Sequence, residues 1–248
     1  MSTLLDKLLL HASKYAPFSH KQKWRIGMRD EISFWDQHIA KNYVPRNGQF
    51  PSTEGQARTA PDTPLQDTFV QLLAWTNDPV LRILDVGSGP FTRVGKTMPG
   101  RTLEVTAVDP LSEEYKKLFT KHAVRPPVIP IEGAGETLHQ LFPADHFHFA
   151  HANNCLDHGF DPVESVSQMV QVVRPGGYVY LRHEVNVAET AGYMGMHQWN
   201  FLLDANGDFI IRDKKRVVNM NKHLGRGVRI TSQHEGDFLV TTIHRAPQ

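Results

Sequence analysis

The feature that most constrains the fold is a regular alternation of apolar, strand-like runs and helix-like segments between residues 82 and 182. Alternation with short connectors is typical of a mostly parallel sheet with helices on both faces. The clearest helix is Pro162–Val173, which Arg174-Pro175-Gly176-Gly177 should end. The five predicted strands of this region are Arg82–Val86, Glu104–Asp109, Pro127–Glu132, His146–Ala150 and Tyr178–Arg182.

The segments on either side of this core have patterns of their own. Residues 1–45 have a helical apolar stripe that includes Trp24 and Trp35, and residues 45–64, rich in proline and glycine, predict an irregular connector. A further helix is expected at about 65–77. The alternation of strands and helices ends after the fifth strand, where a hairpin with its turn at 205–208 is expected. The strands Val228–Ser232 and Phe238–His244 follow and should close the sheet with an antiparallel edge. The resulting division is a helical lid and connector (1–64), a core (65–186), a substrate-side cap insertion (187–222) and the last two strands (223–248).

Composition limits the classes of partner. The 27 basic and 26 acidic residues nearly cancel, so no global field draws the chain to nucleic acid or to a membrane surface. Cys155 is the only cysteine, which excludes an intramolecular disulfide and a cysteine-based zinc cluster. The apolar run Leu8–Leu10 is too short for a signal peptide or a membrane span, so a cytoplasmic location is expected.

A glycine turn follows the first core strand. The strand runs into Asp85, and Gly87 and Gly89 come directly after it. Glycines let the chain turn sharply and let a ligand approach the backbone. In doubly wound sheets, a turn at the carboxyl end of a strand is where ligands bind. The sequence therefore predicts a ligand site at this turn.

Two neighbouring features narrow the choice of ligand. Pro90 follows the turn, and Thr92 stands where a dinucleotide-binding motif would place its third glycine, which counts against a nicotinamide cofactor. The second strand ends at Asp109, twenty-four residues after Asp85. An acid at that position can accept hydrogen bonds from both hydroxyls of a ribose.

This order of motifs resembles the class I S-adenosylmethionine (SAM)-dependent methyltransferases, in particular their type 11 branch, from about Leu81 to Arg182. The resemblance implies SAM as cofactor. It also implies an α/β, Rossmann-like, doubly wound seven-stranded sheet with the seventh strand antiparallel, here with an N-terminal helical lid and an insertion after strand 5. Ala134 and His148 depart from the family, which often has Asp at these positions. The implied cofactor-binding residues are Asp85, Gly87, Ser88, Gly89, Asp109, Pro110, Leu111, Ala134, Gly135, Glu136, Asn153 and Asn154.

Candidate catalytic residues are three histidines and one acid. His158, His183 and His197 fall where this fold presents side chains to a substrate, and a histidine is the usual general base for a hydroxyl acceptor. Asp157 precedes His158, but adjacent side chains usually point in different directions. A divalent metal held by acids and histidines of these loops is the less favoured alternative, and the prediction is no metal.

The acceptor is expected to be a small polar molecule, most simply a sugar or glycan hydroxyl. The segment from His197 to Phe201 mixes polar and aromatic residues suited to such a ligand, and similar chains resemble bacterial surface-glycan and sugar-tailoring methyltransferases. The open alternatives are an N- or C-methyltransferase of a natural product, a non-catalytic SAM-binding partner and a nicotinamide-dependent reductase. Neither nucleic acid binding nor membrane insertion is expected, whereas a homodimer is possible.

Overall fold

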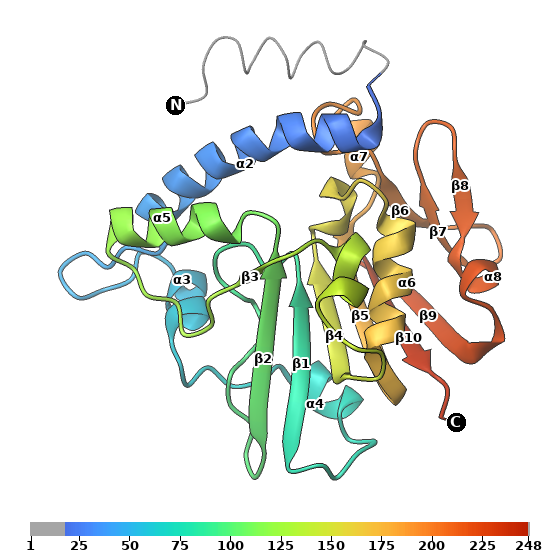
Figure 1. Ribbon diagram of the computed structural model, residues 1–248, viewed down its shortest axis with the longest axis horizontal. Coiled ribbons are helices and arrows are strands. Elements are labelled where there is room, and N and C mark those ends of the chain that lie inside the picture. The colour runs from blue at the N-terminus through green and yellow to red at the C-terminus, as the bar shows by residue number, and fades with distance from the viewer. Residues whose placement is uncertain (1–17, 248) are drawn as a thin grey trace.

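A computed structural model describes residues 18–247 of the chain (Figure 1). Its centre is a seven-stranded sheet with the order β3-β2-β1-β4-β5-β10-β9. All neighbouring pairs from β3 to β5 are parallel, whereas β10 runs antiparallel to both β5 and β9. The strands are β1 (Val80–Val86), β2 (Thr102–Asp109), β3 (Ile131–Glu132), β4 (Phe147–Asn153), β5 (Val173–Glu184), β9 (Val228–Glu235) and β10 (Phe238–Arg245).

This topology confirms the predicted seven-stranded sheet with its last strand antiparallel. The last two strands close the sheet with an antiparallel edge, as expected. Strand β10 pairs with β5, and β9 pairs with the outer side of β10.

Two strand boundaries differ from the predictions for local reasons. Only Ile131–Glu132 of the strand predicted at 127–132 pairs with β2, and Pro127 and Pro130 have no N–H to donate to a ladder. The residues Arg174–Gly177 lie inside β5, not in a turn before it. The register between β4 and β5 shifts there, and Gly176 has φ of 85°.

The sheet is covered on both faces because its strands present apolar residues to each side. Leu84 of β1 packs in the cluster that contains Val166 and Met169 of α6 (Pro162–Val172). Its neighbour Ile83 packs in a second cluster with Phe69 of α4 (Asp67–Leu72). Consecutive strand residues point to opposite faces, so this alternation requires helices on both sides.

The helices before the core differ from the prediction in their extents. Ser19 caps α2 (His20–Asn42) with a reciprocal capping box through Gln22, which fixes where the helix starts. The part of the predicted 1–45 helix at residues 1–17 lies outside the described residues. The connector predicted to be irregular contains a short helix, α3 (Thr53–Thr59), and the helix expected at 65–77 is limited to α4.

The residues after β5 form a small second sheet. It consists of β6 (Asn200–Leu203), β7 (Phe209–Arg212) and β8 (Val217–Asn219), flanked by α7 (Val187–Thr190) and α8 (Met220–Leu224). The predicted hairpin at 205–208 is the β6–β7 turn. Phe201 and Phe209 are buried in the same apolar cluster as Leu239 of β10, so this sheet shares the main core.

Helix α2 lies across the carboxyl ends of the parallel strands, above α5 (Ser112–His122) in Figure 1. At its start, His20 Nε2 lies 2.7 Å from Asp213 Oδ2 of the small sheet. In its C-terminal third, Asp36 binds Lys121 Nζ at 2.6 Å and His122 Nε2 at 2.7 Å. The helix is therefore anchored on both sides of the strand ends. Among the residues that the structure describes, no helix combines the length and the apolar character needed to cross a bilayer.

Candidate active site

A cavity of about 520 Å³ opens where the carboxyl ends of β1, β2 and β4 meet α2. Its wall draws on segments far apart in the sequence: α2, the turn after β1, the end of β2, the 3₁₀ segments Gly135–Gln140 and Leu156–His158, and the region after β5. The size is within the range of small-molecule sites. All twelve residues expected to bind the cofactor line this cavity.

The glycine turn is shaped by what lies against it. Gly87 and Gly89 have φ of 61° and 63°, a left-handed conformation that glycine adopts without strain. A Cβ on Gly87 would stand 2.5 Å from Cys155 Cβ, and one on Gly89 would stand 2.7 Å from the Trp35 ring. Both the conformation and the lack of a side chain are therefore required for this turn.

Asp109 closes the turn from the end of β2. Its Oδ2 accepts the N–H of Gly89 at 3.0 Å, and its Oδ1 accepts the N–H of Leu111 at 2.9 Å. Burial raises the pKa of Asp109 to about 6, against the lowering effect of these two backbone hydrogen bonds. A buried carboxylate is thus tied to the glycine turn and exposed to the cavity.

The Asp85 carboxylate forms hydrogen bonds with two neighbouring side chains. Its Oδ2 accepts the hydroxyl of Thr92 at 2.5 Å, and its Oδ1 lies 2.7 Å from Nδ1 of His151 on β4. In the sequence, Thr92 is noticeable only because it replaces the third glycine of a dinucleotide-binding motif. In the structure, its hydroxyl donates to Asp85 and holds that side chain in place. His151 also lines the cavity and was not anticipated.

Glu136 also lines the cavity. Its Oε1 accepts the N–H groups of Phe160 at 2.8 Å and Asp161 at 3.0 Å, and its burial raises its pKa. The carboxylate therefore fixes the loop that leads into α6. Ala134 and Gly135, beside it, contribute to the wall of the cavity.

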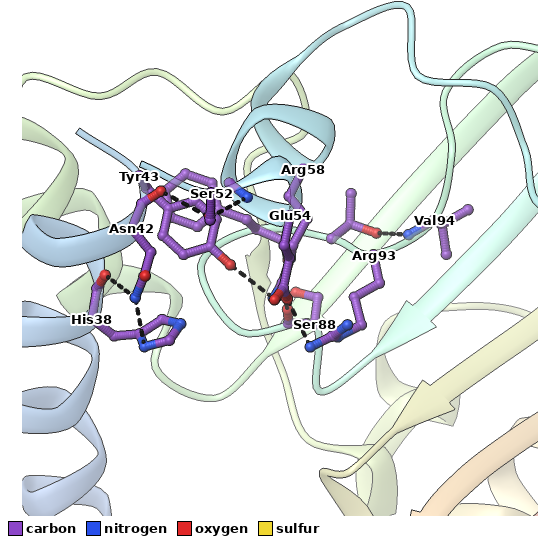
Figure 2. Close-up of polar contacts among 12 residues, drawn as sticks. His38, Asn42, Tyr43, Ser52, Glu54, Arg58, Ser88, Arg93 and Val94 are labelled. Atoms are coloured by element: carbon purple, nitrogen blue, oxygen red, sulfur yellow. Dashed lines mark hydrogen bonds and ion pairs between the residues drawn. The ribbon is translucent and has the colours of Figure 1, made fainter. Parts of the chain in front are cut away.

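Arg58 of α3 is buried against the glycine turn, as Figure 2 shows. Its guanidinium donates to the carbonyl oxygens of Phe91 and Ser88 and, at 3.0 Å, to the Tyr43 hydroxyl. It also forms an ion pair with Glu54 at 3.1 Å. Arg58 is therefore not a solvated loop residue, because its guanidinium is bound by backbone carbonyls at and just after the turn.

Helix α2 contributes more of the wall than the sequence indicates. Trp24 and Trp35, the two tryptophans of its apolar stripe, both line the cavity. The other α2 residues of the wall are Met28, Glu31, Phe34 and His38. The sequence shows the two tryptophans as part of a stripe with helical spacing. The spacing predicts a helix, but it does not show which surface or ligand the stripe contacts.

The other end of the cavity holds a cluster around Asp157. Asp157 Oδ2 lies 2.9 Å from His197 Nδ1 and 3.3 Å from His158 Nε2. Burial acts to raise the pKa of Asp157, but the charge of His158 and the hydrogen bond and charge of His197 outweigh it and hold this pKa at about 2. The expectation that adjacent side chains diverge was wrong here, because the 3₁₀ turn at 156–158 brings His158 back to the carboxylate.

His183 and Trp199 are placed differently from the predictions. His183 is buried, stacks on Phe201 at 4.4 Å and accepts the N–H of Leu156 at Nε2, and burial lowers its pKa to about 4. Trp199 is 1% exposed and contacts the ring of His20 at 4.7 Å. Neither lines the cavity, so both are core residues. Within the segment from His197 to Phe201, the residue that lines the cavity is His197.

Asn153 ends β4 and Asn154 follows it, and both residues line the cavity. Asn154 has φ of 47°, and its Oδ1 accepts the N–H of Glu184 at 2.8 Å, which ties the end of β4 to the end of β5. His148, noted as a departure from the family, is buried near the other end of β4, where its Nδ1 accepts the N–H of Arg82. That histidine is structural.

Part of the chain around this cavity is similar in sequence to a known protein family. Residues 84–181 match the family model described as a methyltransferase domain. Over these residues the chain is similar to a methyltransferase domain, and SAM is the cofactor. The matched segment begins at Leu84, three residues before Gly87, and ends within β5. It therefore contains all the residues expected to bind the cofactor, and the Asp157–His158 pair.

Solved structures with some likeness to the chain include three with low sequence identity. A protein from Pyrococcus horikoshii is 10% identical over 86% of this chain and 98% of its own, with a TM-score of 0.45. A SAM-dependent methyltransferase from Mesorhizobium loti is 16% identical over 71% and 97%, with a TM-score of 0.42. The CMeT domain of the citrinin polyketide synthase is 18% identical over 68% and 47%, with a TM-score of 0.46. No curated protein matches the chain in sequence.

The methyltransferase domain alone does not make the cavity. Trp24, Trp35 and Arg58 precede the matched residues, and Glu184 and His197 follow them. The segments outside the domain therefore provide much of the wall around its glycine turn.

Proposed function

We propose that this methyltransferase transfers the methyl group of SAM to a hydroxyl group of a small polar acceptor, a sugar or glycan. The observation that supports the acceptor assignment is the cluster of Asp157, His158 and His197, which lines the same cavity as the glycine turn. The cluster places hydrogen-bond acceptors opposite the cofactor residues.

The cofactor end fits SAM. The two glycines leave a cradle that a Cβ would fill, and Asp109 exposes a buried carboxylate beside it. In the proposed arrangement, the Asp109 carboxylate accepts hydrogen bonds from the ribose hydroxyls. The backbone of residues 87–89 holds the methionine part of SAM, and Leu111 packs on the adenine. SAM supplies a methyl group on a positively charged sulfur, so the task of the chain is to align an acceptor oxygen with it.

The acceptor end suits a hydroxyl-rich ligand. Glu31, Asn153 and Glu184 add polar groups to the wall, and Trp24 adds an aromatic surface. Sites of this composition hold sugar rings by hydrogen bonds and by packing on an indole. The proposed role of residues 187–222 is to cap this end, and Val187, Met196 and His197 are the cap residues that line the cavity.

The proposal is tested by measuring release of S-adenosylhomocysteine from SAM with panels of sugars, nucleotide-sugars and amines. Turnover with a hydroxyl acceptor is expected, with loss of about 10²-fold or more in His197→Ala. His234→Ala is the matched control, because His234 is exposed on β9, outside the cavity. Turnover with amines alone, or full activity in His197→Ala, contradicts the proposal.

A further inference from the structure

The Asp157 cluster has the donor set of a metal centre. One carboxylate oxygen of Asp157 and one ring nitrogen each of His158 and His197 all lie within 4.8 Å of one another. Asp157 is buried, whereas the side chains of His158 and His197 are 25% and 39% exposed. All three residues line the cavity, so the donor atoms are accessible from the ligand side.

The spacing of the donors matches coordination. Bonds of about 2.0–2.2 Å to a common metal place neighbouring donor atoms roughly 3–3.5 Å apart. The two distances from Asp157 Oδ2 are 2.9 Å to His197 and 3.3 Å to His158. The second distance is long for a charge-assisted hydrogen bond, which is about 2.7–2.9 Å. The two spacings from the carboxylate oxygen are therefore compatible with a metal ion bound by Asp157 and both imidazoles.

The rings also converge from independent segments. His158 ends the 3₁₀ turn after β4, whereas His197 comes from the cap, and their ring centroids lie 4.5 Å apart at 77°. Glu31 and Glu184 line the same cavity and lie close enough to act on the charge of His197. This negative surrounding favours a cation at the point where the rings meet.

We propose that Asp157, His158 and His197 bind a divalent first-row transition metal ion. Two imidazoles and one carboxylate select ions such as Zn²⁺, Co²⁺ or Fe²⁺ over Mg²⁺ and Ca²⁺, which prefer oxygen ligands. Three protein ligands leave coordination positions open, as in catalytic and not structural sites. Where it concerns catalysis, the inference rests on the proposed function, because an acceptor hydroxyl oxygen would take an open position.

The test uses the full chain without an affinity tag, treated with EDTA and dialysed. Co²⁺ is titrated by visible absorption and Zn²⁺ by calorimetry, with Mg²⁺ as the contrasting ion. One Co²⁺ or Zn²⁺ per chain is expected, and His158→Gln and His197→Gln each weaken binding at least about tenfold. His223→Gln and His234→Gln, outside the cluster, should bind as the unchanged chain does.

The folding of the variants is checked by thermal unfolding and by SAM binding. Both histidine variants should still fold and bind SAM, because the two histidine side chains are partly exposed. Lack of saturable binding, or equal binding in the cluster and control variants, overturns the metal site. The proposed function fails separately: methyl transfer that is insensitive to EDTA leaves the acceptor assignment intact, whereas metal binding without any methyl transfer contradicts only that assignment.

Discussion

Cys155 lies so close to Gly87 that a methyl group added to the glycine would stand 2.5 Å from Cys155 Cβ and 2.7 Å from Cys155 Sγ. The lone cysteine of the chain thus presses on the glycine turn from the end of β4. Cys155 Sγ in turn donates to the carbonyl oxygen of Val86 at 3.1 Å. The shape of the cofactor turn depends on a residue 68 positions away in sequence (155 minus 87).

Gly87→Ala is therefore expected to lower the free energy of unfolding by about 2–4 kcal/mol. Left-handed strain contributes roughly 1–2 kcal/mol, and the overlap with Cys155 contributes the remainder. Gly100→Ala is the matched control, because Gly100 has φ of 75° and nothing within 4 Å of an added Cβ. Denaturant unfolding of both variants measures the difference, and equal losses would show that Cys155 does not restrict the turn.

Asp109→Asn is expected to weaken SAM binding at least about tenfold, since charge-assisted hydrogen bonds to the ribose contribute roughly 1.5–3 kcal/mol. In the unliganded chain at pH 7 the change has two opposing effects on stability. It removes a buried carboxylate whose pKa is about 6 and whose ionisation opposes folding, but it also leaves the N–H of Gly89 or of Leu111 without its acceptor. The net change in the free energy of unfolding is therefore expected to be small. Calorimetry with SAM and thermal unfolding without it report the two effects. Unchanged affinity would place the ribose elsewhere.

The raised pKa of Asp109 also predicts opposite pH trends for folding and for binding. Because the folded-state pKa is raised from 3.8 to about 6, the contribution of Asp109 to stability is fully present below pH 3.8 and is lost as the pH rises through 6. SAM binding needs the carboxylate, so affinity should fall as the pH drops below 6. Calorimetry between pH 5 and 8 tests this trend, with Asp109→Asn as the variant that should lack it.

Arg58→Ala is expected to destabilise the chain by roughly 2–5 kcal/mol, because it leaves the carbonyl groups of Ser88 and Phe91 without their donor. SAM affinity should fall with it, since these carbonyls belong to the cofactor turn. Arg46→Ala, at an exposed position just before α3, is the control and should change little. Denaturant unfolding and calorimetry of both variants decide whether Arg58 holds the turn.

Trp199→Ala and His197→Ala should separate stability from activity. Trp199 is 1% exposed, so its truncation should lower the free energy of unfolding by about 3–5 kcal/mol. His197 is partly exposed, so its truncation should cost less stability than that of Trp199, the loss arising from its hydrogen bond to buried Asp157, and should reduce methyl transfer. Thermal unfolding and turnover are measured on both variants. A destabilised but fully active Trp199→Phe variant would support a purely structural role for the indole.

The sequence predicted the sheet well because buried parallel strands are short apolar runs between turn residues. The core strands from β1 to β5 and the last pair were all placed, and the glycine turn with Asp109 was found at the correct strand ends. Such motifs are local, so spacing alone locates them. The prediction failed where proline removed ladder donors, as at Pro127 and Pro130 before β3.

Side-chain direction and long-range contacts were beyond the sequence. His183 and His197 were equivalent candidates, and only the packing of β5 against Phe201 shows that His183 is buried. Arg58 is fixed by backbone carbonyls 30 and 33 residues away, which carry no sequence signature. Asp157 reaches His158 because three residues form a 3₁₀ turn that a residue pattern does not specify.

Helix α2 gives the two ends of the cavity a common wall. Trp35 packs over Gly89 at the cofactor end, while Gly27 lies against Met196 of the cap so closely that a Cβ would stand 2.2 Å from Met196 Cγ. A substitution that repositions this helix to admit a larger acceptor therefore also shifts the cover of the cofactor turn. An engineer who seeks new acceptor specificity without loss of SAM affinity should vary cap residues such as Val187 and leave α2 unchanged.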